Sequence, residues 1–490
     1  MTRKRQEQTT DNAGVRRIFL YVLAGYLLLV VLFYFLAGDQ LHYRATRGAI
    51  EMPAADAASM ELSDGAAVEQ VFTAKIDRIE NIGVQFGTYY RTNAGTLTME
   101  LRSQSDGEVL LRQDFDVASI AEGQIAEMTA ETLIENSTHA PLVLRLTADS
   151  ESGMGVTPLI SLNEKVSEDT TEQSVLLFNG EAAEGALCFS ASGEDYIWTG
   201  RHYWKFALGL GVLLAAVFFA VIKRYKAGKR SYLISSVLAL EKYRFLIDQL
   251  VARDFKTRYK RSVLGMFWSV LNPLLTMMVQ YFVFSKIFKN DVPNFAVYLL
   301  IGVVMFSFFS ESTGLTLTSI LGNAGLITKV YMPKYIYPLT RTLSSLVNLA
   351  LSLIPLAVMC LATGVEFKKS AILALHFFVC LVIFTLGLGM LLATSMVFFR
   401  DTQFLWSVLS LMWMYATPIF YPERILPDNL KIILEINPLY YFIKNARVCI
   451  LDGISPEPTE YFLSMAVALG MLLIGALVFR RHQDKFVLYL

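Results

Sequence analysis

The sequence predicts a polytopic α-helical membrane protein in which two N-terminal helical anchors carry an extracytoplasmic β-sandwich. Of its 490 residues, 54% are hydrophobic and only 18% are charged, and several charge-free runs have the length of ~20 residues that a helix needs to cross a bilayer. Residues 38–200, by contrast, alternate apolar with polar positions and hold no long apolar run, which indicates strands. Such a composition excludes an ordinary soluble protein.

The charged and metal-binding residue types argue against several function classes. The 43 Lys and Arg balance the 43 Asp and Glu, so no net charge favours nucleic acid. The four cysteines and five histidines show no metal-ligand spacing, and we expect neither a metal site nor a catalytic constellation. The pattern G-x-x-x-x-G-K-[ST], which cradles nucleotide phosphates, does not occur in the sequence. If ATP drives this protein, the ATPase is therefore a separate chain.

The first predicted element, residues 1–37, is a polar and basic tail followed by an uncleaved anchor. Ile18 to Ala37 is a charge-free apolar run that is long enough to cross a bilayer. A cleaved signal peptide is the alternative, but its apolar core is normally shorter and ends at a small-x-small site. The pattern therefore favours the anchor.

The second element, residues 38–200, has the pattern of one antiparallel β-sandwich. Residues 70–90, 95–116, 140–149 and 174–180 are predicted strands punctuated by Gly, Asn and Asp, and 106–108 is a predicted hairpin turn. The stretch 118–133 is predicted to be a loop with a helical turn. The domain loosely resembles the jelly rolls that often bind sugars, and a spacer or assembly role is an equal alternative. The candidate sugar contacts are Tyr89, Tyr90 and Phe115.

Residues 201–230 are the second anchor and a basic link. The apolar run from Tyr203 to Ile222 is followed at once by KRYKAGKR. Because cytoplasmic flanks are rich in Lys and Arg, the tail and this link are expected in the cytoplasm and the β domain outside it.

Six further spans are predicted in the last part of the chain, and they give eight spans with both ends in the cytoplasm. They lie near residues 263–287, 295–318, 337–363, 371–398, 404–420 and 460–479. The segment from Tyr421 to Glu460 is too long for a simple loop, and Pro427 and Pro438 interrupt its apolar stretches. We expect a short re-entrant helical hairpin there, because irregular backbone at membrane depth must be buried in protein.

The stretch from Glu241 to Arg261 precedes these spans and predicts an amphipathic helix. Apolar residues recur at helical spacing through it, while Arg and Lys gather at its C-terminal end. This pattern is typical of a helix that lies flat on a membrane surface and directs its cations toward lipid phosphates.

Five motifs, in order, carry a resemblance to a known family. They are ARDFKTRYKRSVLGMFWSVLNPLL from Ala252, LITKVYMPKYIYPL from Leu326, FFRD from Phe398, TPIFYP from Thr417 and NPLYYFIKNAR from Asn437. Together they resemble the permease subunit of polysaccharide-exporting ABC transporters of the ABC-2 type, which include the O-antigen and teichoic-acid export permeases. The resemblance covers residues 231–490, whereas the first ~230 residues do not fit the usual family pattern.

The resemblance implies a function and partners. It implies a six-span permease core in a bacterial plasma (inner) membrane, a homodimer, and two copies of a cytoplasmic ATPase that bind ATP and Mg²⁺. The expected substrate is a lipid-linked polysaccharide, and the chain itself is expected not to be an enzyme. An exporter of another amphiphile is one alternative, and a membrane-anchored glycan-binding or assembly protein is another. An integral glycosyltransferase would need an acidic catalytic cluster, which we do not find in the sequence.

The resemblance also implies which residues couple the permease to its ATPase. Lipid-phosphate anchoring is the alternative role for the cations of the surface helix. The candidates are Arg253, Asp254, Lys256, Arg258 and Tyr259 in that helix, and Lys329, Met332, Pro333 and Lys334 in the cytoplasmic link 321–338. Arg400 and Asp401 form a predicted charged pair at the cytoplasmic end of a span, where snorkelling and local pairing are the alternative.

Aromatic residues in or beside the spans are candidates for a sugar conduit, since aromatic rings stack on the C–H faces of sugars. Membrane-interface belts and packing explain such residues equally well. Glu311 is a more specific candidate because a carboxylate inside a span is costly unless it faces water, protein or a partner chain. The path candidates are Trp268, Tyr281, Phe306, Phe309, Glu311, Trp413, Tyr415 and Tyr421.

Overall fold

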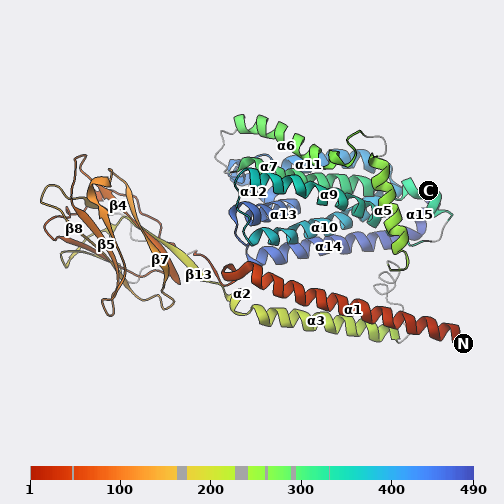
Figure 1. Ribbon diagram of the computed structural model, residues 1–490, viewed down its shortest axis with the longest axis horizontal. Coiled ribbons are helices and arrows are strands. Elements are labelled where there is room, and N and C mark those ends of the chain that lie inside the picture. The colour runs from red at the N-terminus through yellow and green to blue at the C-terminus, as the bar shows by residue number, and fades with distance from the viewer. Residues whose placement is uncertain are drawn as a thin grey trace. The chain divides into compact units, whose positions relative to one another are not determined.

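The protein folds into one unit of strands and one unit of helices. The computed structural model describes residues 2–46, 49–162, 174–226, 241–259, 263–287, 294–329 and 332–490. Residues 39–203 form the β unit, and residues 1–38 together with 204–490 form the helical unit (Figure 1). These boundaries lie close to those expected from the change in residue pattern.

The β unit consists of two antiparallel sheets. The seven-stranded sheet has the order β1-β13-β4-β9-β12, with β2 paired to β9 and β7 paired to β4. Its strands are β1 (Tyr43–Ala45), β2 (Ala57–Ala58), β4 (Arg78–Gly87), β7 (Ile125–Glu135), β9 (Thr157–Ser161), β12 (Ala186–Leu187) and β13 (Phe189–Tyr196). The six-stranded sheet has the order β11-β10-β3-β8-β5-β6. Its strands are β3 (Ala67–Phe72), β5 (Thr96–Ser103), β6 (Val109–Asp116), β8 (Leu142–Asp149), β10 (Val175–Phe178) and β11 (Glu181–Ala183).

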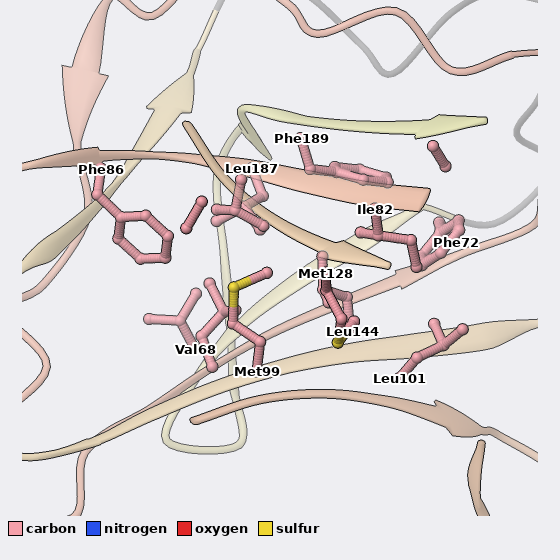
Figure 2. Packing of buried hydrophobic residues seen from close by; sticks show 14 of the residues in the cluster. Val68, Phe72, Ile82, Phe86, Met99, Leu101, Met128, Leu144, Leu187 and Phe189 are labelled. Carbon is pink, nitrogen blue, oxygen red and sulfur yellow. The ribbon is translucent and has the colours of Figure 1, made fainter. Parts of the chain in front are cut away.

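A single hydrophobic core lies between the two sheets. Along β8, Leu142, Leu144 and Leu146 are buried while the residues between them are more exposed, which is the period-2 pattern of a half-buried strand. Figure 2 shows side chains of both sheets meeting there, including Phe72 and Phe189, whose rings lie 4.9 Å apart. The arrangement is the sandwich that the alternating pattern predicted.

The turn prediction at residues 106–108 is confirmed, and the prediction of a loop with a helical turn at 118–133 is right up to residue 124 and wrong from residue 125. Strands β5 and β6 pair as a hairpin, and Gly107 in its turn has φ +70°. Only Val117–Ser119 forms a short 3₁₀ turn, while residues 125–135 form β7 against β4. The burial of Ala126, Met128 and Ala130 follows a strand period, so pairing with β4 overrides the weak strand propensity of the Ala and Glu residues there.

The helical unit contains a long N-terminal hairpin and a bundle. Its helices are α1 (Thr2–Ala37), α3 (Tyr203–Lys226), α5 (Arg244–Tyr259), α6 (Trp268–Ile287), α7 (Phe295–Leu317), α8 (Ala324–Ile327), α9 (Ile336–Ala362), α10 (Ser370–Phe398), α11 (Thr402–Ala416), α12 (Asp428–Ile436), α13 (Pro438–Arg447), α14 (Pro458–His482) and α15 (Phe486–Tyr489). A short helix, α2 (Trp198–Arg201), ends the β unit.

Six helices in the described part of the chain are long and apolar enough to cross a membrane: α1, α3, α7, α9, α10 and α14. Helix α6 has 20 residues, Trp268–Ile287, close to the predicted span at 263–287. One predicted span is shorter than expected: α11 has 15 residues, which extend about 22 Å against the ~30 Å of a hydrocarbon core. Helix α11 ends at Ala416 because Pro418 lacks an N–H and disfavours helical backbone at Thr417.

The centre of the bundle is formed by α7 and α10. In the apolar stretch of α7, 72% of the residues are buried, and in that of α10, 56% are. Glycines let α10 meet α14 closely, since a Cβ atom on Gly475 would lie 1.9 Å from the Gly387 carbonyl oxygen. Small residues of this kind are what membrane helices use to approach backbone to backbone.

Helices α1 and α3 pair with each other and α1 also contacts the bundle. The Tyr26 hydroxyl donates a hydrogen bond to the Ala207 carbonyl at 2.5 Å, and this contact joins the two anchors. The ring of Phe33 lies 5.1 Å from that of Tyr461 in α14, edge to face. Helix α1 is therefore packed on the bundle and not merely tethered to it.

The segment between α11 and α14 is a broken helical hairpin. Helix α12 follows Pro427, and α13 begins at Pro438, where the preceding Asn437 caps the helix by accepting a hydrogen bond from the Leu439 N–H at 3.1 Å. The predicted helical hairpin is thus present, with α13 largely buried and α12 more exposed.

Candidate functional site

Helix α5 packs against the bundle through a face that is only partly apolar. Ile247, Leu250 and Asp254 follow one another at spacings of three and four residues and therefore share one side of the helix. Ile247 and Leu250 are buried, whereas Phe245 is 76% exposed on another side. The face of α5 that packs on the bundle is therefore part apolar and part charged.

That carboxylate joins α5 to α9 through an ion pair. Arg341 Nη1 lies 2.8 Å from Asp254 Oδ2, and Arg253 Nη2 lies 3.0 Å from Asp254 Oδ1. The Ser344 hydroxyl adds a longer contact of 3.5 Å to Oδ2. The Asp254 side chain is only 11% exposed, so removing Arg341 would leave a poorly solvated charge with less compensation.

A cavity of about 550 Å³, lined by both polar and apolar groups, lies beside this ion pair. Residues of α5, α7 and α9 line it, and Asn348 is one of them. Asn348 also donates a hydrogen bond of 2.8 Å to Glu311 in α7. The intramembrane carboxylate that sequence reasoning singled out therefore has a partner within the chain, and a chain of polar contacts leads from α5 through α9 to α7.

A hydrophobic cluster, here called the coupling cluster, joins the same elements on their apolar side. It contains Ile247 of α5, Ile320, Ile327, Met332, Ile336 and Tyr337 of the link and the start of α9, Met390, Ala393 and Val397 of α10, Phe479 of α14 and Phe486 of α15. Because close-packed interiors transmit strain, a displacement of the link or of α5 would be felt by α9 and α10.

The C-terminal segment closes this cluster and was missed by sequence reasoning. Phe486 is fully buried, and Lys334 Nζ donates a hydrogen bond of 2.6 Å to the Gln483 carbonyl. Phe398, the first residue of the FFRD motif, lies 4.9 Å from Tyr489 and 5.6 Å from His482, ring to ring. The apolar FVLY that follows the polar residues 480–485 was a usable signal for this docking, because an apolar segment after polar residues favours packing against another apolar surface.

The last two sequence motifs are bound to each other. The Trp413 indole N–H donates to Asn437 Oδ1 at 2.7 Å, and the Asn437 amide donates to the Thr417 hydroxyl at 2.8 Å. The buried Arg447 guanidinium stacks over the Tyr298 ring at 3.4 Å. It also donates to the carbonyls of Tyr298, Pro418 and Ile419 at 3.2, 2.7 and 3.0 Å. TPIFYP and NPLYYFIKNAR are therefore parts of one cluster of polar contacts at the N-terminal end of α7. This cluster, made of Trp413, Thr417, Asn437, Arg447 and Tyr298, is here called the polar knot.

Comparison with known proteins gives this architecture its family. The ABC-2 type transporter family model matches residues 246–451. The O-antigen export system permease protein RfbA of Myxococcus xanthus is 30% identical over 256 residues, which are 52% of this chain and 98% of that protein. The chain belongs to the ABC-2 type transporter family.

Other relatives agree with this assignment. RfbA of Klebsiella pneumoniae, also an O-antigen export system permease protein, is 29% identical over 248 residues, 49% of this chain and 95% of that protein. The polysialic acid transport protein KpsM of Escherichia coli is 23% identical over 249 residues, again 49% and 95%. The resemblance to polysaccharide-export permeases that the motifs indicated is confirmed. The family match lies wholly in the bundle, outside the β unit and the two anchors.

The predicted coupling residues differ in their exposure and in their contacts with the ABC-2 bundle. Lys256 and Lys329 are exposed and Pro333 is partly buried, while the side chains of Arg258 and Tyr259 lie outside the described residues. Met332 is buried in the coupling cluster, and the Lys334 ammonium group is bound to the C-terminal segment. The contacts of these two side chains within the chain are thus with the bundle and with the C-terminal segment, and their contact with an ATPase stays a prediction.

The link between α7 and α9 of this ABC-2 permease contains a short helix. A 3₁₀ turn, Leu321–Asn323, leads into α8, which spans four residues. Residues 330 and 331 of the LITKVYMPKYIYPL motif lie outside the described residues. The link is anchored through Ile327 and Met332, whereas Lys329 remains exposed.

Among the path candidates, the structure brings Phe306, Phe309 and Trp413 together. The Phe309 ring lies 5.7 Å from Phe306 and 5.3 Å from Trp413. Phe309 is fully buried, whereas Phe306, 8% exposed, lines a cavity of about 400 Å³ between α7 and α11. Packing accounts for Phe309, and a path role for Phe306 stays a prediction.

The remaining path candidates do not join that aromatic group. Trp268, Tyr281 and Tyr415 are exposed on the bundle surface. The Tyr421 hydroxyl donates to the Tyr415 carbonyl at 2.8 Å and so closes the turn after α11.

Arg400 and Asp401 mark a turn and not an ion pair. Helix α10 ends at Phe398 and α11 begins at Thr402, and both charged residues are exposed in the short connection. Within the described part of the chain, no ion pair joins them. Their predicted place at the end of a span agrees with the structure, whereas local pairing between them is not seen among the residues that the structure describes.

The three sugar-contact candidates of the β unit also differ in how exposed their side chains are. Phe115 is only partly exposed and packs against the sandwich core, so it supports the fold. Tyr89 and Tyr90 are 49% and 90% exposed in the turn after β4. Only these two are available to a ligand.

Proposed function

We propose that this chain is the transmembrane subunit of an ATP-driven exporter that moves a lipid-linked polysaccharide across a bacterial inner membrane. The observation that carries the proposal is the match of the bundle to nearly the full length of export permeases, 98% of the Myxococcus xanthus protein and 95% of the Escherichia coli polysialic acid transport protein. Two copies of the chain would enclose the path, and two copies of a separate ATPase would bind beneath them. The β unit would lie outside the membrane, and both termini would lie in the cytoplasm.

The contacts around α5 support a specific route for the force. Closure of the ATPase would displace the exposed cytoplasmic side of α5 and of the link, where Lys256 and Lys329 lie. The Asp254–Arg341 ion pair would transmit that displacement to α9, and the coupling cluster would transmit it to α10. Since α7 and α10 are the most buried helices, a shift at their cytoplasmic ends would change how the two copies meet.

The polar knot around Arg447 would hold one end of the spans in place while their cytoplasmic ends move. Its guanidinium ties α13, the start of α7 and the turn after α11 through three carbonyl contacts. A half-transporter needs one end of its spans held while the other moves, and a buried cation with three acceptors is suited to hold it.

Deletion of the chain in its own organism tests the proposal against its alternatives. The expected result is loss of the surface polysaccharide together with accumulation of lipid-linked polymer on the cytoplasmic side. A glycosyltransferase would leave no polymer in either place, and an assembly protein would leave the amount of exported polymer unchanged. Either of these results would reject the export function.

A further inference from the structure

The turn after β4 presents two successive tyrosines in a backbone conformation that bulky residues rarely adopt. Tyr89 and Tyr90 have φ +56° and +55°, in the left-handed region. Gly, Asn or Asp fit such positions with less strain, because their side chains do not crowd the following carbonyl. Sequence optimisation of the turn for folding alone would therefore not place two aromatic residues there.

A carboxylate from another loop fixes this turn. Glu122 accepts hydrogen bonds from the Thr88 N–H at 2.6 Å and the Thr88 hydroxyl at 2.8 Å, and it makes a longer contact of 3.5 Å with the Tyr90 N–H. The buried Asn93 amide donates to the Thr88 carbonyl at 3.2 Å. The hydrogen bonds from the Thr88 backbone and side chain also lower the pKa of Glu122, so the carboxylate stays charged at neutral pH.

The rings of Tyr89 and Tyr90 differ in their exposure and in their contacts with neighbouring side chains. Tyr89 is half exposed, and the Arg91 guanidinium lies 4.9 Å from its ring centroid, which supports it from one side. Arg91 itself is held by Asn93 at 3.0 Å and by an ion pair with Glu61. Tyr90 is 90% exposed and gains almost nothing from burial in the fold. The strained turn therefore supports one braced ring beside one free ring.

We infer that the Tyr89–Tyr90 turn is a carbohydrate-binding site that takes sugar units of the exported polysaccharide. A sugar ring offers one apolar C–H face to an aromatic ring and a rim of hydroxyls to polar neighbours. Tyr90 provides an open aromatic face, Arg91 provides a polar group beside the Tyr89 ring, and Glu122 provides another at the backbone of the turn. The choice of a polysaccharide as ligand rests on the proposed function. That two exposed aromatic rings are held side by side in the sequence rests on the structure of the turn itself.

The decisive variant removes the rings without harming the turn. Tyr89→Asn with Tyr90→Gly relieves the left-handed strain, so the full-length protein in nanodiscs is expected to unfold at the same or a higher temperature. Its affinity for polysaccharide purified from the surface of the same organism should fall at least tenfold. Tyr90→Phe keeps the ring and loses only the hydroxyl, and it should bind within about threefold of the wild type.

Titration of that polysaccharide into the nanodiscs, followed by calorimetry, gives the affinities. Equal binding by the wild type and by the Asn-Gly variant would overturn the site, and so would absence of wild-type binding at millimolar sugar. If instead the wild-type turn binds empty lipid vesicles and not the polysaccharide, the ligand class is wrong.

The amount of surface polysaccharide, measured in cells with the wild-type chain and with the Asn-Gly variant, separates this inference from the export function. If the wild-type chain exports normally although its β unit does not bind the polysaccharide, the transporter proposal stands and only the sugar site is removed. Unchanged surface polysaccharide in the complete deletion would instead reject the transporter.

Discussion

Asp254 of α5 and Arg341 of α9 form an ion pair at 2.8 Å, and both side chains are mostly shielded from water. The pair explains why a helix with a charged residue on its packing face still docks on an apolar bundle: the carboxylate meets a guanidinium and not a hydrocarbon surface. We expect α5 and α9 to move together, because separating the two charges would take this close counter-charge from Arg341 and leave Asp254 with Arg253 alone as its ionic partner within the described ranges.

The first prediction concerns this pair. Asp254→Asn and Arg341→Gln should each lower the free energy of unfolding by about 1.5–3 kcal/mol, the range for hydrogen bonds to charged groups, and should reduce export. The exchange Asp254→Arg with Arg341→Asp should recover part of both losses. Lys256→Ala, which changes an exposed residue of the same helix, is the stability control. Denaturant unfolding of purified variants checks the prediction, and additive losses in the exchanged pair would argue against coupling between the two residues.

The second prediction concerns the C-terminal segment. Phe486→Ala should cost about 3–5 kcal/mol if the cavity cannot collapse, because the ring is fully buried in the coupling cluster. Leu488→Ala is the matched control in the same short helix, since Leu488 is 83% exposed. Export and ATP hydrolysis should be measured together in membranes. We expect Phe486→Ala to lose export per ATP hydrolysed while Leu488→Ala behaves as the wild type, and equal behaviour of the two variants would remove the segment from the coupling route.

The third prediction concerns Arg447. Lysine cannot replace its three carbonyl contacts and its stacking on Tyr298, so Arg447→Lys should sharply reduce the fraction of folded protein. Arg400→Lys makes the same chemical change at an exposed position and should have little effect. Size-exclusion profiles of detergent-solubilised protein report the difference. Indistinguishable profiles would show that the knot does not need a guanidinium.

The fourth prediction concerns topology. A cysteine placed at Asp106 in the β5–β6 turn should react with a membrane-impermeant maleimide in intact cells, and one at Asn323 in the link should react only after permeabilisation. The physical reason is the concentration of Lys and Arg beside the anchors, which are retained on the cytoplasmic side. Labelling of the Asn323 site in intact cells would contradict the orientation.

Much of the architecture could be predicted from local patterns in the sequence. Charge-free runs located α1, α3, α7, α9, α10 and α14, and period-2 alternation located most of the sandwich, because both signals come from neighbouring residues meeting one environment. The strand at 125–135 was missed because its alternation uses Ala and Glu, whose strand propensity is low. The short α11 was overestimated because apolar residues continue past Pro418, where the helix has already ended.

The site itself was only partly predictable, since its contacts join residues far apart in the chain. Asp254 was singled out, but its partner Arg341 lies 87 residues later and had no distinguishing motif. Lys334 and Gln483 are 149 residues apart, and nothing in the local pattern connects them. Sequence patterns identified elements well, whereas the inward orientation of Met332 and Lys334 and the burial of Phe309 depend on tertiary packing.

Transport in inverted inner-membrane vesicles tests the central claim most directly. Vesicles from the native organism would receive radiolabelled lipid-linked polysaccharide on their outer, cytoplasmic face, and protection of the label from an added glycosidase would report its transfer into the lumen. The account predicts protection that requires ATP, disappears in vesicles from a strain deleted for this chain, and returns when the wild-type chain is supplied. Equal protection without ATP, or in vesicles that lack the chain, would contradict it.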